Sequence, residues 1–372
     1  MTMSLTFDAV SENRPGPKWK ARWDRSWPAY RAWFTARGGD NGPDRAACEA
    51  AIERHMPELS GLHRRLTQMA GDDDRAACFL SAWCPPPYLG GCSLAAAADA
   101  DSVRLVRNYD LSPDLNEGLL LRSAWTGRPV MGMVEFLWGL SDGINADGLS
   151  IALAYGGGSD TGTGFGICLI LRYVLETCST VPEAIAVLKR VPSHMAYNLV
   201  LADRAGRTAS VEMHPGGGLL SRPVAVATNH QHGSRMPDRP AFTRTRERYA
   251  HLETMIKERP RPSNLAEQFL KEPLFQSNFA AGFGTLFTAE YDPDTTGMTL
   301  HWPDGQWVQD LNDFQEGQRV IHYDPDTTQS QDWVDALRPW LGGAADQLDV
   351  LSPDTDWAAL GREIGTYWQN RS

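Results

Sequence analysis

The chain has 372 residues, of which 42% are hydrophobic and 22% charged, a composition typical of a globular protein with one large or two ordinary domains. Its net charge of −11 argues against the basic surface that a nucleic acid or an anionic membrane surface requires, so we expect no nucleic-acid partner and no membrane partner. We find no signal-peptide pattern and no run of about 18 apolar residues, and we therefore predict a cytoplasmic protein.

The N-terminal quarter is predicted to be helical. Residues 17–39, 44–71 and 74–83 are amphipathic stretches that end at Gly-Gly, at Gly and before Pro-Pro-Pro. Aromatic residues recur at near-helical spacing in the first stretch, which favours core packing: Trp19, Trp23, Trp27, Tyr30 and Trp33. Because no Gly/Ser linker follows, we do not expect this region to be an independent domain.

After Gly91 the pattern changes to strands and tight turns. Three segments have the order strand, polar turn, strand: residues 92–109, 198–214 and 286–302. Further strands and helices are predicted in the remainder, with two short helices after residue 330: strands at 129–140, 148–156 and 223–228, and helices at 165–178, 181–191, 242–258 and 263–272. Hairpins outnumber strand–helix–strand units, so we predict an α+β body with antiparallel sheets and helices packed outside them.

Six cysteines are spread along the chain without a CxxC pair, and they predict no disulfide framework: Cys48, Cys78, Cys84, Cys92, Cys168 and Cys178. Cys92 has an unusual setting, because it follows Gly90 and Gly91 and begins a predicted strand. These glycines permit unusual backbone geometry and remove side-chain bulk beside the carbonyl group that precedes the thiol.

A cysteine attacks amides only as the thiolate, so it needs a base. None of the nine histidines is an obvious candidate, since His214, His230 and His232 lie in predicted loops or strand ends. An N-terminal cysteine can use its own α-amine, whose pKa of about 7.7–8.0 suits neutral pH. That route requires cleavage of the bond between Gly91 and Cys92.

The segment Arg107-Asn108-Tyr109-Asp110 follows on the next predicted strand. If the turn lies near residues 99–102, this segment returns beside Cys92. Arg107 would then lower the pKa of the thiol, and Asp110 would hold the ammonium group of a freed N-terminus.

Several motifs in this order resemble the acyl-coenzyme A:6-aminopenicillanic-acid acyltransferase-like group, related to penicillin V acylase and bile salt hydrolase among the N-terminal-nucleophile hydrolases. They are GGCS, RNYD, DGINADGLSIALAYGG, VLETCSTVPEAIAVLKRVP, YNLVLADRAGRTASVEM and ATNH, and the resemblance covers roughly residues 20–305. It implies an αββα fold, with two antiparallel sheets between helical layers, and a precursor that cuts itself before the cysteine. It also implies a helical pro-region at 1–91, packed on the body, and an αββα domain with a helical tail at 92–372.

The resemblance also assigns roles to residues of this chain. It implies that Cys92 is the nucleophile and Arg107 and Asp110 the arginine and carboxylate beside it. It implies that the side-chain amide of Asn229 and the backbone N–H of Tyr155 donate to the oxyanion, an interaction of about 2.7–4 kcal/mol per donor. No cofactor is implied. Leu111 replaces an aromatic residue of many relatives, and a second arginine of some relatives has no counterpart after residue 270.

Three other signals are set aside. The glycine-rich segment 156–166 lacks the Lys-Ser/Thr ending of a phosphate-binding loop and is expected to shape the substrate entrance. His230 and His232 have no further ligands at metal-site spacing, so we expect no metal. Glu212 is either a second carboxylate near the site or a buried, hydrogen-bonded strand residue.

The sequence therefore predicts a self-processing amidohydrolase that cleaves a small N-acyl compound through a thioester at Cys92. An acyltransferase would use the same thioester with an amine in place of water. An uncleaved thiol hydrolase and a non-catalytic scaffold are the alternatives. The oligomeric state, monomer or homo-oligomer, stays open, as does the identity of the acyl and amine parts.

Overall fold

The computed structural model describes residues 3–88, 90–158, 160–233, 243–258, 260–279 and 283–323. The helices predicted after residue 330 lie outside these ranges. Within them, no helix is both long enough and apolar enough to cross a membrane.

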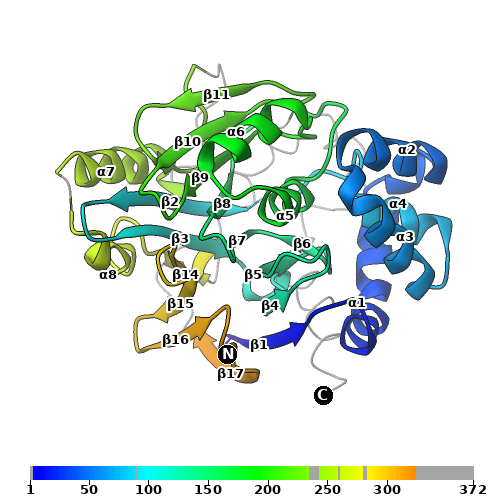
Figure 1. Ribbon diagram of the computed structural model, residues 1–372, viewed down its shortest axis with the longest axis horizontal. Coiled ribbons are helices and arrows are strands. Elements are labelled where there is room, and N and C mark those ends of the chain that lie inside the picture. Colours follow the sequence, from blue (N-terminus) through cyan, green and yellow to red (C-terminus); the bar gives the residue numbers. More distant parts are fainter. Residues whose placement is uncertain are drawn as a thin grey trace.

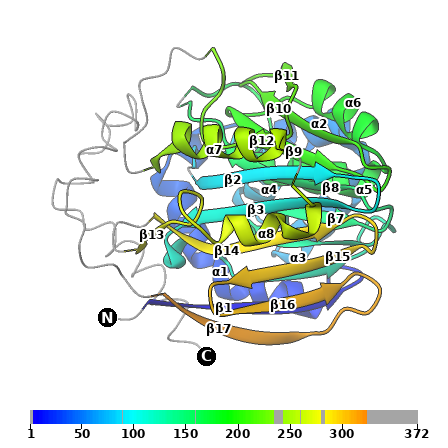
Figure 2. The same ribbon diagram turned by 90° about the vertical axis from the view of Figure 1, so that its left-hand side faces the viewer.

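Two sheets form the centre of the molecule (Figures 1 and 2). In the described residues the large sheet has ten strands in the order β11-β10-β9-β8-β7-β5-β4-β1-β17, with β6 beside β5. Its strands are β1 (Met3–Glu12), β4 (Leu119–Ser123), β5 (Val130–Glu135), β6 (Gly139–Leu140), β7 (Asp142–Asn145), β8 (Ser150–Tyr155), β9 (Tyr197–Ala202), β10 (Thr208–Met213), β11 (Leu219–Arg222) and β17 (Gly317–Tyr323).

The small sheet has seven described strands in the order β12-β2-β3-β14-β15-β16, with β13 beside β14. Its strands are β2 (Gly91–Ala98), β3 (Val103–Leu111), β12 (Val226–Ala227), β13 (Ser277–Asn278), β14 (Phe283–Asp292), β15 (Gly297–Trp302) and β16 (Gly305–Asp310). All its pairings are antiparallel, and the three predicted hairpins are confirmed.

Helices cover the outer faces of both sheets (Figures 1 and 2). Two of them, α7 (Thr245–Lys257) and α8 (Leu265–Phe269), pack on the small sheet. The others lie on the side of the large sheet: α1 (Pro17–Ala36), α2 (Arg45–His55), α3 (Ser60–Met69), α4 (Asp74–Ser81), α5 (Ile167–Thr177) and α6 (Val181–Arg190). The four layers confirm the predicted αββα arrangement.

Alternation along β2 decides where each of its side chains points. Cys92, Leu94 and Ala96 belong to the core between the two sheets, whereas Ala95 and Ala97 pack outward against α7 and α8. Successive side chains of a strand point to opposite faces of the sheet, which explains this division. The thiol of Cys92 therefore faces the interior between the sheets.

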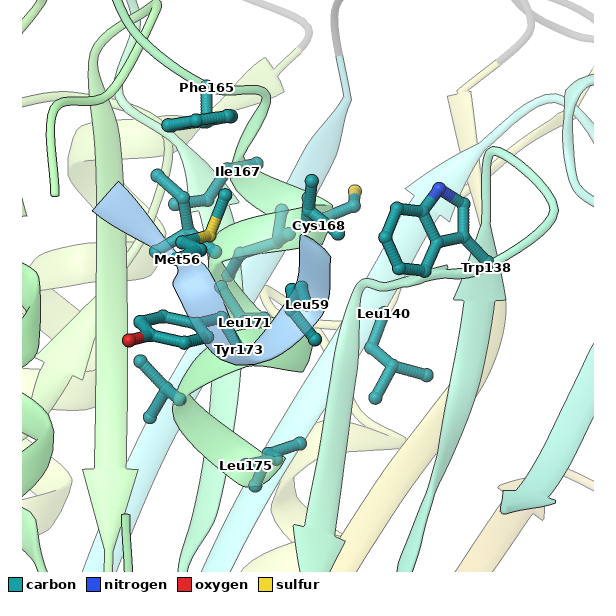
Figure 3. Close-up of a cluster of buried hydrophobic side chains, with 14 of the residues drawn as sticks. Met56, Leu59, Trp138, Leu140, Phe165, Ile167, Cys168, Leu171, Tyr173 and Leu175 are labelled. Carbon is teal, nitrogen blue, oxygen red and sulfur yellow. The ribbon is translucent and has the colours of Figure 1, made fainter. Parts of the chain in front are cut away.

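The N-terminal helices pack on the outer face of the large sheet through aromatic side chains. The ring centroids of Trp19 and Trp23 lie 5.4 Å apart and those of Trp23 and Trp27 lie 4.5 Å apart, in stacked geometry. Figure 3 shows the neighbouring part of this core, where Met56 and Leu59 meet the buried side of α5. The predicted helical character of residues 17–83 and the packing role of the tryptophans are confirmed.

The structure differs from the helical description of residues 1–91 at the N-terminus. Met3–Glu12 form strand β1, which runs between β4 and β17 inside the large sheet. Seven residue pairs join it to β17 and five join it to β4. Only Phe7 and Ala9 of this strand are fully buried, so its sequence carries a weak alternating signal.

Candidate active site

Cys92 lies in the hairpin that β2 and β3 form. The register places Cys92 opposite Tyr109, and a hydrogen bond of 3.0 Å from the N–H of Asp99 to the carbonyl oxygen of Ser102 closes the turn. The carboxylate of Asp99 also accepts the N–H of Ser102 at 2.9 Å, a typical local role of aspartate in turns. The predicted return of the RNYD segment beside Cys92 is thus confirmed.

Arg107 contacts the thiol on the inner face of the small sheet. Its Nη2 lies 3.2 Å from Sγ of Cys92, and its Nη1 donates to Oδ2 of Asp142 at 2.5 Å. Both side chains of this ion pair are completely buried. Asp142 also accepts a hydrogen bond from the hydroxyl of Tyr291 at 2.6 Å, and the ring of Tyr109 lies 4.3 Å from the guanidinium. These contacts fix the orientation of Arg107 toward the thiol.

Opposing effects act on the pKa of the Cys92 thiol. Burial raises this pKa above its ordinary value, and the positive charge of Arg107 opposes that effect. The negative charge of Asp110 raises the pKa further, whereas Arg248 lowers it. Because burial dominates, the thiol of the intact chain is neutral at pH 7.

The backbone of Cys92 is held by two side chains from distant segments. Its N–H donates to Oδ1 of Asn229 at 3.0 Å, and its carbonyl oxygen accepts from Nη1 of Arg248 at 2.6 Å. Arg248 also donates to Oδ1 of Asn229 at 3.0 Å and to Oγ of Ser93 at 2.7 Å. One guanidinium thus joins the nucleophile candidate to Asn229.

Asp110 lies on the opposite face of the small sheet from the thiol, because it follows Tyr109 in β3. It accepts a hydrogen bond from Oγ1 of Thr285 at 2.8 Å, and its Oδ2 lies 3.5 Å from Nη1 of Arg248. Burial raises the pKa of this carboxyl group, while Arg248 lowers it. In the intact chain the described contact of the Cys92 nitrogen is with Asn229, so the predicted role of Asp110 at a freed ammonium stays a prediction.

Asn229 brings Tyr155 and the start of β2 together. Its Nδ2 lies 3.2 Å from the carbonyl oxygen of Tyr155 and 3.4 Å from that of Gly90. Tyr155 is the last residue of β8, and its carbonyl group rather than its N–H makes this contact. The structure therefore groups Asn229, Tyr155 and Cys92, and the roles of the two donors at an oxyanion stay predictions.

Gly91 is required by close packing. A Cβ atom on this residue would lie 2.3 Å from the ring of Phe283 and 2.9 Å from the carbonyl oxygen of Asp110, whereas a Cβ on Gly90 would meet nothing within 4 Å. Gly91 forms part of β2 and pairs with Asp110. The absence of a side chain, and not an unusual backbone conformation, explains the glycine directly before the nucleophile candidate.

Two carboxyl groups near Tyr109 are a buried one, Glu135, and a partly buried one, Glu117. The hydroxyl of Tyr109 donates to Oε1 of Glu135 at 2.8 Å, and Glu117 accepts from the hydroxyl of Tyr30 on α1. Burial, with a further contribution from the negative charge of Glu117, raises the pKa of Glu135 to about 8. Tyr109 of the RNYD segment thus contacts Glu135 in β5, and Tyr30 of α1 contacts Glu117.

Arg248 is the site residue that the sequence analysis missed. It lies in α7, its side chain is fully buried, and it contacts Cys92, Asn229 and Asp110. The segment before and within α7 contains several arginines, and no spacing distinguishes this one. The sequence carries no signal for Arg248, because its burial and its contacts appear only in the folded structure.

The signals set aside in the sequence have structural explanations. A Cβ at Gly162 would lie 2.3 Å from the backbone nitrogen of Gly216, and one at Gly164 would lie 2.4 Å from the backbone of Ser193, so close chain packing explains these glycines. Nδ1 of His232 lies 2.8 Å from Oε1 of the buried Glu212. In the described ranges, no group of three or more His, Cys, Asp or Glu side chains could hold a metal ion.

The comparison with protein families bears on this geometry. A sequence model described as acyl-coenzyme A:6-aminopenicillanic acid acyl-transferase matches residues 97–307, more than half of the chain. The chain belongs to this family. The matched part of this acyl-transferase family member contains Arg107, Asp110, Tyr155, Asn229 and Arg248, and it begins five residues after Cys92.

Solved structures with a similar arrangement include a mutant conjugated bile acid hydrolase from Clostridium perfringens, at 14% identity over 64% of this chain and 98% of that chain, with a TM-score of 0.43. A penicillin V acylase from Agrobacterium tumefaciens is similar at 17% identity over 59% of this chain and 86% of that chain, also with a TM-score of 0.43. No curated protein matches this acyl-transferase chain.

Proposed function

We propose that the protein is a self-processing cysteine amidohydrolase that cleaves the amide bond of a small N-acyl compound. The observation that carries the proposal is the joint setting of Cys92, with Arg107 at its thiol and Asn229 at its backbone nitrogen. None of the contacts described for Cys92 involves a histidine, so a base from elsewhere is needed, and a freed α-amine supplies one. Family membership supports acyl transfer to the thiol.

Self-processing uses the bond that precedes Cys92. The sulfur attacks the carbonyl carbon of Gly91, the bond from that carbon to the nitrogen of Cys92 breaks, and the thiol proton passes to the released amine. A thioester now links Gly91 to the sulfur. Water then adds its hydroxyl group to the carbonyl carbon, the bond from that carbon to the sulfur breaks, and the other proton of the water passes to the sulfur. The products are a carboxylic acid at Gly91, which loses its proton to solvent and becomes a carboxylate, and a free N-terminal Cys92.

The mature site repeats this chemistry on a substrate. The α-amine accepts the thiol proton, the thiolate attacks the acyl carbon, and the ammonium returns the proton to the leaving nitrogen. Hydrolysis of the thioester releases the acid and restores the thiol. Arg107 favours the thiolate, Arg248 and Asn229 hold the backbone of Cys92, and Nδ2 of Asn229 is the side-chain donor toward the oxyanion.

An acyltransferase is the second candidate, favoured by the description of the matching family. An acceptor amine would attack the thioester in place of water, and the other residues would keep their roles. The two activities are distinguished by adding a primary amine during turnover and measuring the ratio of amide product to free acid.

The test is intact-mass measurement of the purified wild type, Cys92→Ala and the control Cys84→Ala, followed by a panel of amide substrates. We expect the wild type and Cys84→Ala to yield fragments of residues 1–91 and 92–372 and to hydrolyse amides. We expect Cys92→Ala to stay full length and inactive. A cleaved or active Cys92→Ala protein would contradict the proposal.

A further inference from the structure

Two cysteines of the N-terminal helices lie close together, outside the candidate active site. Cys48 belongs to α2 and Cys78 to α4, and these two helices pack against each other at the right of Figure 1. Sγ of Cys48 lies 3.7 Å from the carbonyl oxygen of Pro43, and Sγ of Cys78 lies 3.5 Å from the same oxygen. The two thiols also hydrogen-bond to each other. Close approach of two sulfur atoms is the first geometric requirement of a disulfide.

Packing and ion pairs orient the two helices in this way. Arg45 at the start of α2 pairs with Asp74 at the start of α4 at 3.2 Å, and with Asp72 just before that helix at 2.8 Å. Side chains from both helices, among them Ile52 and Leu80, belong to one hydrophobic cluster. The meeting of the two sulfur atoms is therefore a property of the folded helical layer.

The two thiols differ in exposure and in acidity. Cys48 is completely buried, whereas Cys78 is partly exposed to solvent. The hydrogen bond with Cys78 lowers the pKa of the Cys48 thiol, and burial opposes this effect. The same hydrogen bond raises the pKa of Cys78. The pair thus combines a sulfur that a reagent can reach with a buried partner that holds a negative charge, as thiol–disulfide exchange requires.

We propose that Cys48 and Cys78 form a reversible disulfide, which links α2 to α4, on exposure to a low-molecular-weight disulfide. The thiol of Cys78 loses its proton, its sulfur attacks one sulfur of the reagent, and half of the reagent leaves as a thiolate. The thiol of Cys48 then loses its proton and attacks Sγ of Cys78, and the other half leaves as a thiolate. The two released thiolates take up the two protons, so the protein is oxidised by two electrons and the reagent is reduced to two thiols.

The disulfide would close a loop that contains α3 and most of α2. Because it restricts the unfolded chain over that loop, it should stabilise the helical layer that covers the large sheet. The inference goes beyond the proposed function and does not depend on it, since neither cysteine has a role in cleavage or turnover.

The first test exposes the native wild type to oxidised glutathione at neutral pH and then blocks the remaining thiols with iodoacetamide in urea. Peptide mass spectrometry should find Cys48 joined to Cys78. Cys48→Ser should keep glutathione on Cys78, because no thiol resolves the mixed disulfide. Cys78→Ser should leave Cys48 unmodified, because Cys48 is buried. Cys84→Ser is the matched control, since Cys84 is partly exposed like Cys78, and it should form the same disulfide as the wild type.

The second test measures stability. The oxidised wild type should have a thermal midpoint at least about 2 °C above that of the reduced protein, and dithiothreitol should remove the shift. Cys48→Ser should show no such shift. The inference is overturned if both thiols of the wild type stay free, if Cys78 is joined to a different cysteine, or if the disulfide forms and the midpoint does not move. A wild type that forms the disulfide and yet is never cleaved before Cys92 would refute the proposed function and leave this inference standing.

Discussion

Arg248 donates a hydrogen bond of 2.6 Å to the carbonyl oxygen of Cys92 across 156 residues of sequence. The same guanidinium reaches Asn229 and Asp110, and all of these side chains are fully buried. Helix α7 thereby holds the start of β2 in place from the outer face of the small sheet, as Figure 2 shows for the two elements. Loss of the Arg248 guanidinium should therefore lower the stability of the fold and disturb the alignment of the Cys92 nucleophile.

We predict that Arg248→Met lowers the free energy of unfolding by about 3–5 kcal/mol, because it leaves Asp110 as a buried charge without its cation. Self-processing should slow in parallel. Urea denaturation and the time course of cleavage measure the two effects. Arg244→Met is the control on the same helix end, where the pair with Glu247 is partly exposed, and it should cost less than about 1 kcal/mol. Equal effects of the two variants would contradict the assignment.

Variants of Arg107 separate the effect of its thiol contact on cleavage from the effect of its ion pair with Asp142 on stability. Arg107→Leu should destabilise the protein by about 3–5 kcal/mol, because Asp142 would keep a buried charge. The double variant Arg107→Leu/Asp142→Leu removes both charges and should recover at least half of that loss. Cleavage at Cys92 should stay slow in both variants, since neither has a cation at the sulfur. Recovery of cleavage in the double variant would show that Arg107 acts only through folding.

Gly91 and Gly90 form a matched pair for testing the packing before Cys92. Gly91→Ala should destabilise the protein by about 1–3 kcal/mol and slow processing, because the new methyl group meets Phe283 and the backbone of Asp110. Gly90→Ala should have little effect, since open space surrounds that position. Thermal unfolding and intact-mass time courses give the comparison, and indistinguishable variants would rule out the packing explanation.

The parts of the site that were predictable from sequence depend on local structure. The pairing of Cys92 with the RNYD segment follows from one hairpin, whose turn residues and alternation are visible in the sequence. The same alternation places Asp110 on the face of the sheet opposite the thiol. The prediction that Arg107 and Asp110 both lie beside Cys92 did not include this difference between the two faces. Asn229 and Tyr155 came from the resemblance, since no local pattern joins them to Cys92.

Features that depend on packing between distant segments could not be predicted. Arg248 is one of several arginines in its segment, and only the docking of α7 on β2 singles it out. Strand β1 has two fully buried side chains, and its place between β4 and β17 depends on partners more than a hundred residues away. The contact between Tyr109 and Glu135 likewise depends on packing, because it joins strand β3 of the small sheet to strand β5 of the large sheet.

Strand β1 gives a prediction about the cleaved protein. It belongs to the 1–91 fragment, yet both of its neighbouring strands belong to the 92–372 fragment. We therefore expect the two fragments to elute together in size-exclusion chromatography without denaturant and to separate only in about 6 M urea. The reason is that strand pairing and a common hydrophobic core hold them together. Fragments that separate in plain buffer would contradict this placement of β1.

Glu135 gives a pH dependence of stability. Burial, and secondly the charge of Glu117, raises the pKa of Glu135 to about 8 in the folded protein, from an ordinary value of 4.5. Its favourable contribution is therefore fully present below pH 4.5, where both states are protonated. The contribution declines as the unfolded chain loses its proton first, and it is gone once the pH has risen through about 8.

Glu135→Gln keeps an oxygen acceptor for Tyr109 and cannot ionise. We predict that its free energy of unfolding, relative to the wild type, increases by a few kcal/mol between pH 4.5 and pH 8, as measured by urea denaturation at several pH values. Glu53→Gln, at an exposed position of α2, is the control and should change stability by less than about 0.5 kcal/mol. A difference between Glu135→Gln and the wild type that stays constant over this range would mean that Glu135 is ionised in the folded protein at pH 4.5 and above, held by Tyr109 and Asn116 more strongly than burial opposes it.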